Sequence, residues 1–159
     1  MTQFSAASLD RYDRMILQIL QREGRLPNSD LAGRVNLSES ACLRRVRALE
    51  ASGLIEGYTA ILNQQKAGLG VNVFISITLE RQERADMDDF EQAVRAVPEV
   101  MECYLMTGEY DYLLRVVVAD TADFERLHSR HLTSLPHVAR LHSSFALRRV
   151  QKSRELPVR

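Results

Sequence analysis

The chain has 159 residues, of which 45% are hydrophobic and 26% charged, and its 21 basic and 21 acidic residues give a formal net charge of zero. This composition is typical of a folded globular protein and excludes a disordered chain. No run of 18 apolar residues occurs, so we expect no transmembrane helix. The N-terminal stretch MTQFSAASLD lacks the basic and apolar regions of a signal peptide, which favours a cytoplasmic protein.

Charge is distributed unevenly along the chain. Residues 1–66 carry nine Lys and Arg against seven Asp and Glu, residues 67–145 carry seven against thirteen, and the last fourteen residues carry five against one. A basic head joined to an acidic body predicts two modules with different partners, because only the head would tolerate a polyanion. The basic C-terminal tail could strengthen binding to such a polyanion, but a mobile, solvated terminus is the simpler expectation.

The first sixty residues have the periodicity of helices. The apolar residues of LDRYDRMILQILQREG recur on one helical face, and PNSDLAGRVNL predicts a short second helix. A third helix is expected from the N-cap Ser38 to Gly53. The β-branched and aromatic residues of LIEGYTAILN then predict a short β-hairpin around Glu56 and Gly57. Three helices and a hairpin outline a winged helix-turn-helix domain over residues 1–62.

Residues 63–70 (NQQKAGLG) are polar and contain glycine, which is typical of a linker. Beyond them, residues 71–159 show strands VNVFISITLE, VMECYLMT, YLLRVVV and RLHSSFALRRV. One helix, DMDDFEQAVRAV, follows the first strand, and another begins near Asp120 and is closed by Pro136. This order, β-α-β-β-α-β, is that of the ferredoxin-like fold. The sequence therefore predicts an α+β protein, with an N-terminal winged helix-turn-helix and a C-terminal ferredoxin-like βαββαβ sandwich.

The second face of the predicted sheet carries large apolar side chains. Phe74, Tyr104 and Met106 lie opposite the row that faces the helices. An antiparallel sheet with helices on one side exposes the other, and an exposed apolar patch of this size marks an interface. We expect a homodimer that forms through the open sheet face.

The third predicted helix, SESACLRRVRALEASG, has an outward basic face. At about 100° per residue, its buried stripe consists of Cys42, Val46 and Leu49. Arg44 and Arg47 point away from the stripe with Ser40 between them, and Arg45 lies at its edge. The simplest account is a solvated helix face with salt bridges to nearby glutamates. The helices and hairpin around it favour DNA instead.

A basic helix of this kind suits the major groove of DNA. Arginine can grip the O6 and N7 atoms of guanine, and neighbouring cations and N–H groups hold phosphates. Tyr58 on the hairpin could contact the sugar-phosphate backbone or simply pack. The residues expected to bind DNA are Ser38, Ser40, Arg44, Arg45, Arg47 and Tyr58. Two heads on a dimer would read a roughly palindromic operator in double-stranded DNA.

Several stretches resemble one family. LDRYDRMILQILQREGR, LAGRVNLSESACLRRVRALEASGLIEGYTAILN and TGEYDYLLRV look like the Lrp/AsnC (leucine- and asparagine-responsive, or feast/famine) transcriptional regulators of bacteria and archaea, over about residues 9–149. The resemblance implies a nucleoid-associated DNA-binding protein with a C-terminal ligand-sensing domain. It also implies homodimers that assemble into octamers or larger particles, and an amino-acid effector bound between dimers. It assigns the DNA-reading helix to residues 38–52.

The turn TGEYDY is the expected effector site. Taken alone, it predicts a tight turn between two strands, in which Gly108 is free to take a positive φ. Its acidic pair Glu109 and Asp111 could meet an ammonium group, and its N–H groups a carboxylate. The resemblance places the effector at Thr107, Gly108, Glu109, Tyr110 and Asp111, with Leu135, His137 and Val138 as a weaker facing wall. Many relatives have Asp at position 109 and Gly at position 137, so the amino acid sensed stays open.

Other sites find less support in the sequence. His128 and His131 form an HxxH pattern on a predicted helix, but His131 falls within the apolar stripe and no ligand set is completed. We therefore expect no metal and no cofactor. Cys42 and Cys103 stand in apolar surroundings and are expected to be buried, reduced thiols.

Two other functions stay open at this point. Siroheme decarboxylases resemble the same family in fold, and the four histidines keep such an enzyme as the alternative. A ligand-binding module that acts only through protein partners is a third possibility. The outward basic helix favours the DNA-binding regulator, because neither alternative needs exposed arginines there.

Overall fold

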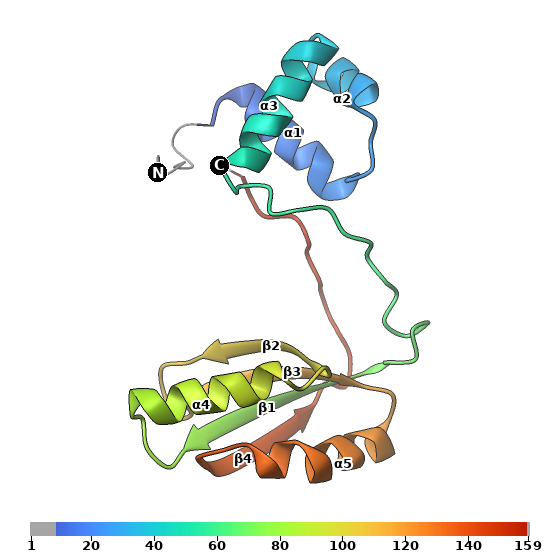
Figure 1. Ribbon diagram of the computed structural model, residues 1–159. Helices are drawn as coiled ribbons and strands as arrows, with labels where there is room; N and C mark the ends of the chain where they lie inside the picture. Colours follow the sequence, from blue (N-terminus) through green and yellow to red (C-terminus); the bar gives the residue numbers. More distant parts are fainter. Residues whose placement is uncertain (1–8, 159) are drawn as a thin grey trace. The chain divides into compact units, whose positions relative to one another are not determined.

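Figure 1 shows the computed structural model, which describes residues 9–158. The chain divides into two compact units, which we call the helical unit and the sheet unit. The helical unit contains the described residues up to Ile61 together with those from Gln151 onward, and the sheet unit is Leu62–Val150. Residues 1–8, which hold most of the stretch used to judge a signal peptide, lie outside the described residues. Within residues 9–158, no helix is long and apolar enough to cross a membrane.

The helical unit contains the three predicted helices, α1 (Arg11–Arg22), α2 (Asn28–Val35) and α3 (Glu39–Ala51). Asp10 caps α1, because its carboxylate accepts hydrogen bonds from the N–H groups of Tyr12 (2.8 Å) and Asp13 (3.0 Å). Ser38 caps α3 as predicted, and its hydroxyl oxygen accepts from the N–H of Ala41 at 3.3 Å. Side-chain acceptors at these positions satisfy N–H groups that have no partner inside the helix.

The core of the helical unit is formed by apolar residues from all three helices. They are Leu9, Ile16, Leu17, Leu31, Ala32, Val35, Cys42 and Leu49. The buried stripe predicted for α3 is confirmed, since Cys42 and Leu49 are buried and Val46 packs against the same cluster. Its position fixes which face of α3 is left for solvent or a ligand.

The predicted hairpin after α3 is wrong. Residues 54–63 contain no strand, and Gly57 has φ 159°, which is extended backbone and makes no turn. A hairpin without a third strand or a covering helix has too little apolar contact to be stable. The segment is instead tied back to α3, because the N–H of Ile55 donates to the carbonyl oxygen of Leu49 at 3.2 Å.

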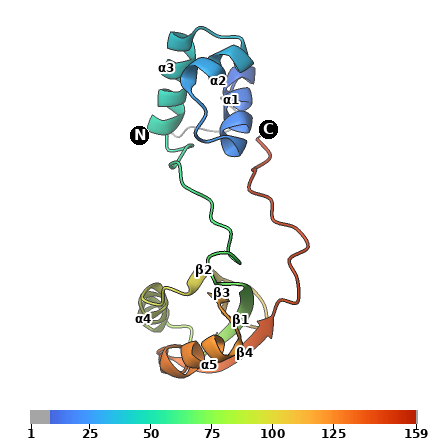
Figure 2. The same cartoon turned by 90° about the vertical axis from the view of Figure 1, so that its right-hand side faces the viewer.

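The sheet unit has the predicted order of elements: β1 (Val71–Leu79), α4 (Arg84–Arg95), β2 (Val100–Leu105), β3 (Tyr112–Val118), α5 (Thr121–Arg130), the short 3₁₀ helix η2 (Leu132–Ser134) and β4 (Val138–Phe145). The strands form one antiparallel sheet in the order β2-β3-β1-β4. Figure 2 shows α4 and α5 together on one side of this sheet. The ferredoxin-like fold is confirmed.

The core of the sheet unit lies between the sheet and its two helices. On β1, the side chains of Val73, Ile75 and Ile77 are fully buried against the helices. Phe90 of α4 lies over the ring of Tyr112 on β3, with ring centroids 4.6 Å apart. This alternation of buried and outward side chains along β1 is the pattern of a sheet that is covered on one face.

The structure ends the second helix of the sheet unit earlier than predicted. α5 stops at Arg130, and η2 separates it from Pro136. His131 is therefore an exposed residue just after the helix and does not join the apolar stripe. The prediction was wrong because it continued the helical period beyond the last helical residue. Cys103 also differs from expectation, since it is exposed on the edge strand β2 while Cys42 is buried.

The last residues of the chain were predicted to be mobile and solvated; residues 151–157 are exposed as expected, but part of the stretch is bound to the helical unit. Residues from Gln151 onward belong to the helical unit, not to the domain predicted over 71–159. The side chain of Val158 packs against the core of the helical unit. The backbone of Leu156 forms hydrogen bonds with the side chain of Gln21 on α1.

Truncating Phe90 to alanine should destabilise the sheet unit strongly. The ring is fully buried, and removing a buried aromatic side chain leaves a cavity that costs about 3–5 kcal/mol of unfolding free energy. Urea unfolding followed by circular dichroism measures the loss. Leu147→Ala is the control, because Leu147 is fully exposed; equal losses in the two variants would contradict this description of the core.

Candidate functional site

The outward face of α3 carries two unpaired cations. Arg44 and Arg47 are exposed, and within residues 9–158 neither guanidinium has a hydrogen bond or an ion pair. Ser40 shares their face, and its hydroxyl lies 3.3 Å from that of Ser38 at the start of the helix. Free guanidinium groups beside a helix N-terminus can hold phosphates or base edges. The structure thus gives these three side chains the exposure that the sequence predicted.

Arg45 has a different role from the other arginines of α3. Its guanidinium forms ion pairs with Asp10 and Asp13 at the start of α1, both at 2.8 Å, and lies 5.4 Å from the ring centroid of Tyr12. These contacts raise the pKa of Arg45, chiefly through the hydrogen bond to Asp13. Arg45 therefore ties α3 to α1 and fixes the orientation of the outward face of α3.

Tyr58 also has a partner within the helical unit. Its hydroxyl donates to Oε1 of Glu50 at 3.0 Å. Partial burial, followed by the neighbouring carboxylate, raises the pKa of Tyr58 to about 12. The tyrosine thus holds the segment after α3 against the end of that helix.

The structure adds one residue to the outward face of α3. Leu43 is 37% exposed and lies beside Arg47 on the helix. An apolar side chain on a DNA-reading helix can contact the methyl group of thymine. The helical wheel could have found Leu43, because the residue falls outside the buried stripe.

The predicted effector loop joins β2 to β3, and Asp111 is its most connected residue. Its carboxylate accepts hydrogen bonds from the N–H of Leu79 and from the side-chain amide of Gln82, both at 2.7 Å. Its own N–H donates to the carbonyl oxygen of Ile77, and its carbonyl oxygen accepts from Met106, both at 2.8 Å. Every polar group of Asp111 is therefore used to hold this loop at the end of β1. Gln82 had no distinguishing signal in the sequence.

Glu109 differs from Asp111 in its surroundings. It is exposed at the tip of the loop, and within residues 9–158 its carboxylate has no hydrogen bond or ion pair. Gly108 precedes it with φ 122°, a conformation that side chains disfavour. Thr107 is exposed and Tyr110 is half-buried. The free acceptor of this loop is thus Glu109.

The loop before β4, residues 135–138, also contacts the C-terminal end of β1, through His137. Its carbonyl oxygen accepts from the N–H of Glu80 at 2.8 Å. Its ring lies between two carboxylates of α4, 3.6 Å from Asp86 and 3.4 Å from Asp89. His137 adopts φ 60°, where a non-glycine residue is strained. Its side chain and backbone thus fix the loop before β4 to α4 and to the end of β1.

The remaining two residues of the predicted facing wall point elsewhere. Leu135 is buried in the core of the sheet unit, and Val138 packs against the same core. These two side chains contribute support for the loop. The three loops that meet at the end of β1, residues 80–83, 106–111 and 135–138, are called the loop cluster below.

The outer face of the sheet remains apolar in a single chain. Phe74 is 38% exposed and Tyr104 is 51% exposed. Met106 is half-buried just beyond β2. Between the rings, Arg115 donates hydrogen bonds to Glu102 (2.8 Å) and Asn72 (3.1 Å).

Two family profiles together match most of the chain. A winged helix-turn-helix DNA-binding profile matches residues 9–56, and the Lrp/AsnC ligand-binding domain matches residues 72–156. The chain belongs to the Lrp/AsnC family. It is therefore a transcriptional regulator with a helix-turn-helix DNA-binding domain and a ligand-binding domain of the Lrp/AsnC type.

Individual relatives cover nearly the whole chain. The Bkd operon transcriptional regulator of Pseudomonas aeruginosa is 44% identical over 91% of this chain and 94% of its own. The leucine-responsive regulatory protein of Escherichia coli K12 is 40% identical over 95% of this chain and 92% of its own. The crystal structure of a Neisseria meningitidis transcriptional regulator in complex with L-methionine superposes with a TM-score of 0.90 and 39% identity, over 95% and 97% of the two chains.

Replacing the cap residue Asp10 by alanine should weaken the helical unit by about 1 kcal/mol at neutral pH. The N–H of Asp13 is the main cause that lowers the pKa of Asp10 from 3.8. Because the folded-state pKa is lowered, this stabilisation is present above pH 3.8 and is lost as the pH falls through the lowered value. Urea unfolding at neutral and acidic pH should show the difference between wild type and variant shrinking in acid.

Asp30→Ala is the matched control for this experiment. Asp30 lies in the first turn of α2 but is not an N-cap residue. A loss at neutral pH as large as that of Asp10→Ala would show that the effect comes from general charge and not from the cap.

Proposed function

We propose that this protein is a sequence-specific DNA-binding regulator that reads double-stranded DNA with α3. The observation that carries the proposal is the pair of exposed guanidinium groups of Arg44 and Arg47 on the face opposite the buried stripe. Ser40 and Leu43 lie on the same face and have the chemistry to contact a base edge and a thymine methyl group. Ser38 contributes at the helix N-terminus. The operator is expected to be roughly palindromic, because a dimer presents two such helices.

Arg45 and Tyr58 take part in this proposal as positioning residues. Arg45 already holds two carboxylates of α1 and fixes the angle of α3. Tyr58 fixes the segment after α3 through Glu50. Both act on DNA through the orientation of the recognition helix.

Arg44→Ala should weaken binding to a selected operator duplex by about 1–3 kcal/mol, because a bidentate contact to guanine is lost. Binding to random DNA should fall much less. The duplex is obtained by selection from a random pool with the wild-type protein, and affinities are compared at one fixed salt concentration. The control is Arg95→Ala, an exposed arginine of α4 in the sheet unit. An equal loss on selected and random DNA would make Arg44 a phosphate contact.

We propose further that the loop cluster binds a free amino acid. The complex of the Neisseria regulator with L-methionine supports this class of ligand. In the proposed site, Glu109 receives the ammonium group, because its carboxylate is exposed and free, and N–H groups of Thr107 and Gly108 receive the carboxylate. Asp111 and His137 hold the loops in place, and Tyr110 lies beside them. Leu135 and Val138 support the loop from the core side.

Glu109→Gln should abolish the thermal shift produced by the effector while leaving the melting temperature of the free protein unchanged. The effector is found by screening the twenty amino acids, since a ligand at a hundredfold excess over its dissociation constant stabilises the folded state by about 2.7 kcal/mol. Glu125→Gln, at an exposed position of α5, is the control. A normal shift in Glu109→Gln would place the ammonium group elsewhere.

The assembly proposed for this protein is a homodimer through the outer sheet face, with larger particles formed from dimers. Phe74 and Tyr104 give that face its apolar character. An effector bound where dimers meet would favour one assembly over another, because it binds the assembled form better. The enzymatic alternative has no observation in its favour: His131 and His142 are exposed, His128 lies next to Phe124, and His137 is placed between aspartates.

A further inference from the structure

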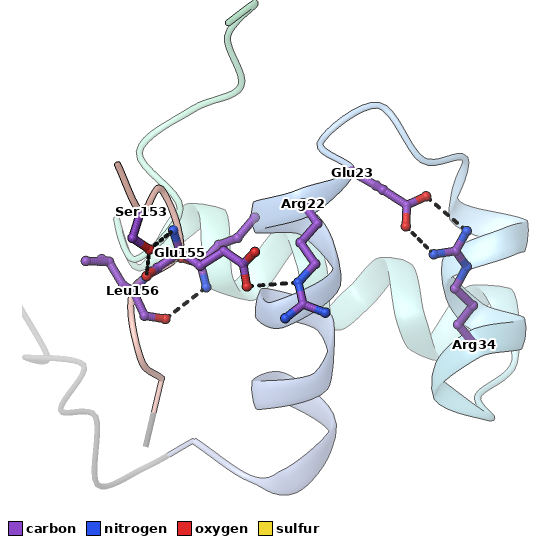
Figure 3. A network of polar contacts seen from close by, with 7 residues as sticks. Arg22, Glu23, Arg34, Ser153, Glu155 and Leu156 are labelled. Atoms are coloured by element: carbon purple, nitrogen blue, oxygen red, sulfur yellow. Dashed lines mark hydrogen bonds and ion pairs between the residues drawn. The ribbon is translucent and has the colours of Figure 1, made fainter. Parts of the chain in front are cut away.

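The C-terminal residues 151–158, called the strap below, form a specific contact with α1. The side-chain amide of Gln21 donates to the carbonyl oxygen of Leu156 at 3.2 Å and accepts from its N–H at 2.6 Å. Next to it, Nε of Arg22 lies 2.8 Å from Oε2 of Glu155. Figure 3 shows Arg22, Ser153, Glu155 and Leu156 in this network. One amide thus pairs with both backbone groups of a single strap residue, as a neighbouring strand would.

The sequence of the strap prepares it for this contact. Ser153 forms a local turn, since its hydroxyl accepts from the N–H of Glu155 and donates to the carbonyl oxygen of the same residue. Leu156 precedes Pro157, and a residue before proline is held in the extended region. Its N–H and C=O groups are therefore presented for pairing before docking occurs. Val158 then adds an apolar contact with the core of the helical unit.

Docking changes how the chain connects the two units. The chain leaves the helical unit after Ile61 and returns to it at Gln151. On the sheet side, the N–H of Ala146 donates to the carbonyl oxygen of Asn72, and Arg149 donates to the side chain of Gln64. Only residues 150–154 separate this anchor from Glu155. With the strap docked, the units are joined by two chain segments; with the strap released, the segment that leaves the helical unit after Ile61 is the one described connection that limits their motion.

The contacts of the strap are suited to reversible docking. Arg22 and Glu155 have side chains 66% and 43% exposed, and ion pairs this exposed contribute little and are screened by salt. The hydrogen bonds replace bonds to water, and fixing the strap costs chain entropy. The docked state is therefore only slightly favoured over the released one.

We propose that the strap is a reversible second tether, which docks on the last turn of α1 in its own chain and limits the motion of the helical unit relative to the sheet unit. Release of the strap lengthens the flexible connection between the two units. In a dimer with one helical unit already bound to its half-site, this lowers the effective concentration of the second helical unit near the other half-site. Any ligand or assembly that favours the docked or the released strap would then alter DNA binding, because it changes how freely the helical unit moves.

The test uses the full-length protein with two separate labels. A nitroxide at Arg154→Cys, in a Cys103→Ala background, reports on the strap, and a dye at Ser29→Cys in the same background reports on rotation of the helical unit. Both labelled positions are exposed. Glu155→Arg should mobilise the strap, because two arginines then face each other, and Gln21→Ala should do so by removing the amide pair. In both variants the fast component of the dye anisotropy should rise about twofold.

A charge exchange separates docking from general damage. Combining Arg22→Glu with Glu155→Arg reverses both partners, so the pair forms again and both labels should return to wild-type behaviour. Two results would overturn the proposal. One is a strap in the wild type as mobile as in Glu155→Arg; the other is a released strap with no change in the rotation of the helical unit.

Discussion

The chain builds two hydrophobic cores that share no residue, and this separation sets how the protein can work. One core is made by α1, α2 and α3, and the other by the sheet with α4 and α5. A change in the packing of one core therefore does not alter the other through shared side chains. The connecting chain and the assembly of several copies are two routes by which the proposed effector site could act on the helical unit. Both routes depend on surfaces and segments outside the cores, which is where the exposed apolar face and the strap are found.

The charged group on the outer sheet face already has partners within the single chain. Arg115 lies among the aromatic side chains, and a buried charge without a partner would oppose association. In the single chain, however, its guanidinium is already bound to Glu102 and Asn72. Covering this face with a second copy would therefore bury a charge that already has partners, while Phe74 and Tyr104 would gain apolar contact. The charge on this face is therefore compatible with a dimer interface.

Sequence periodicity predicted the elements of this protein because each depends on neighbours in the chain. The Ser38 cap, the stripe of α3 and the alternation along β1 are all local patterns, and the structure confirms them. The hairpin at Gly57 failed because β propensity without a partner strand does not make a strand. Arg45 and Leu156 could not be placed, since their partners lie 32 and 135 residues away in sequence. Glu109 and Asp111 look alike in the sequence. The structure distinguishes them, because the carboxylate of Asp111 accepts hydrogen bonds from Leu79 and Gln82 while that of Glu109 is free within the described residues.

Strand β1 connects the loop cluster with the two chain segments that lead to the helical unit. At its end, the N–H of Leu79 and the side-chain amide of Gln82 donate to the carboxylate of Asp111, and the N–H of Glu80 donates to the carbonyl oxygen of His137. At its start, Val71 follows the linker directly, and the carbonyl oxygen of Asn72 holds Ala146, beyond which the chain continues to the strap. The strand pairs along nearly its whole length with β3 and β4, so it moves as a stiff unit. A displacement of the loop cluster along or about β1 would therefore reach both connections to the helical unit together. The same strand that supports the loop cluster thus anchors the two chain segments that lead to the helical unit.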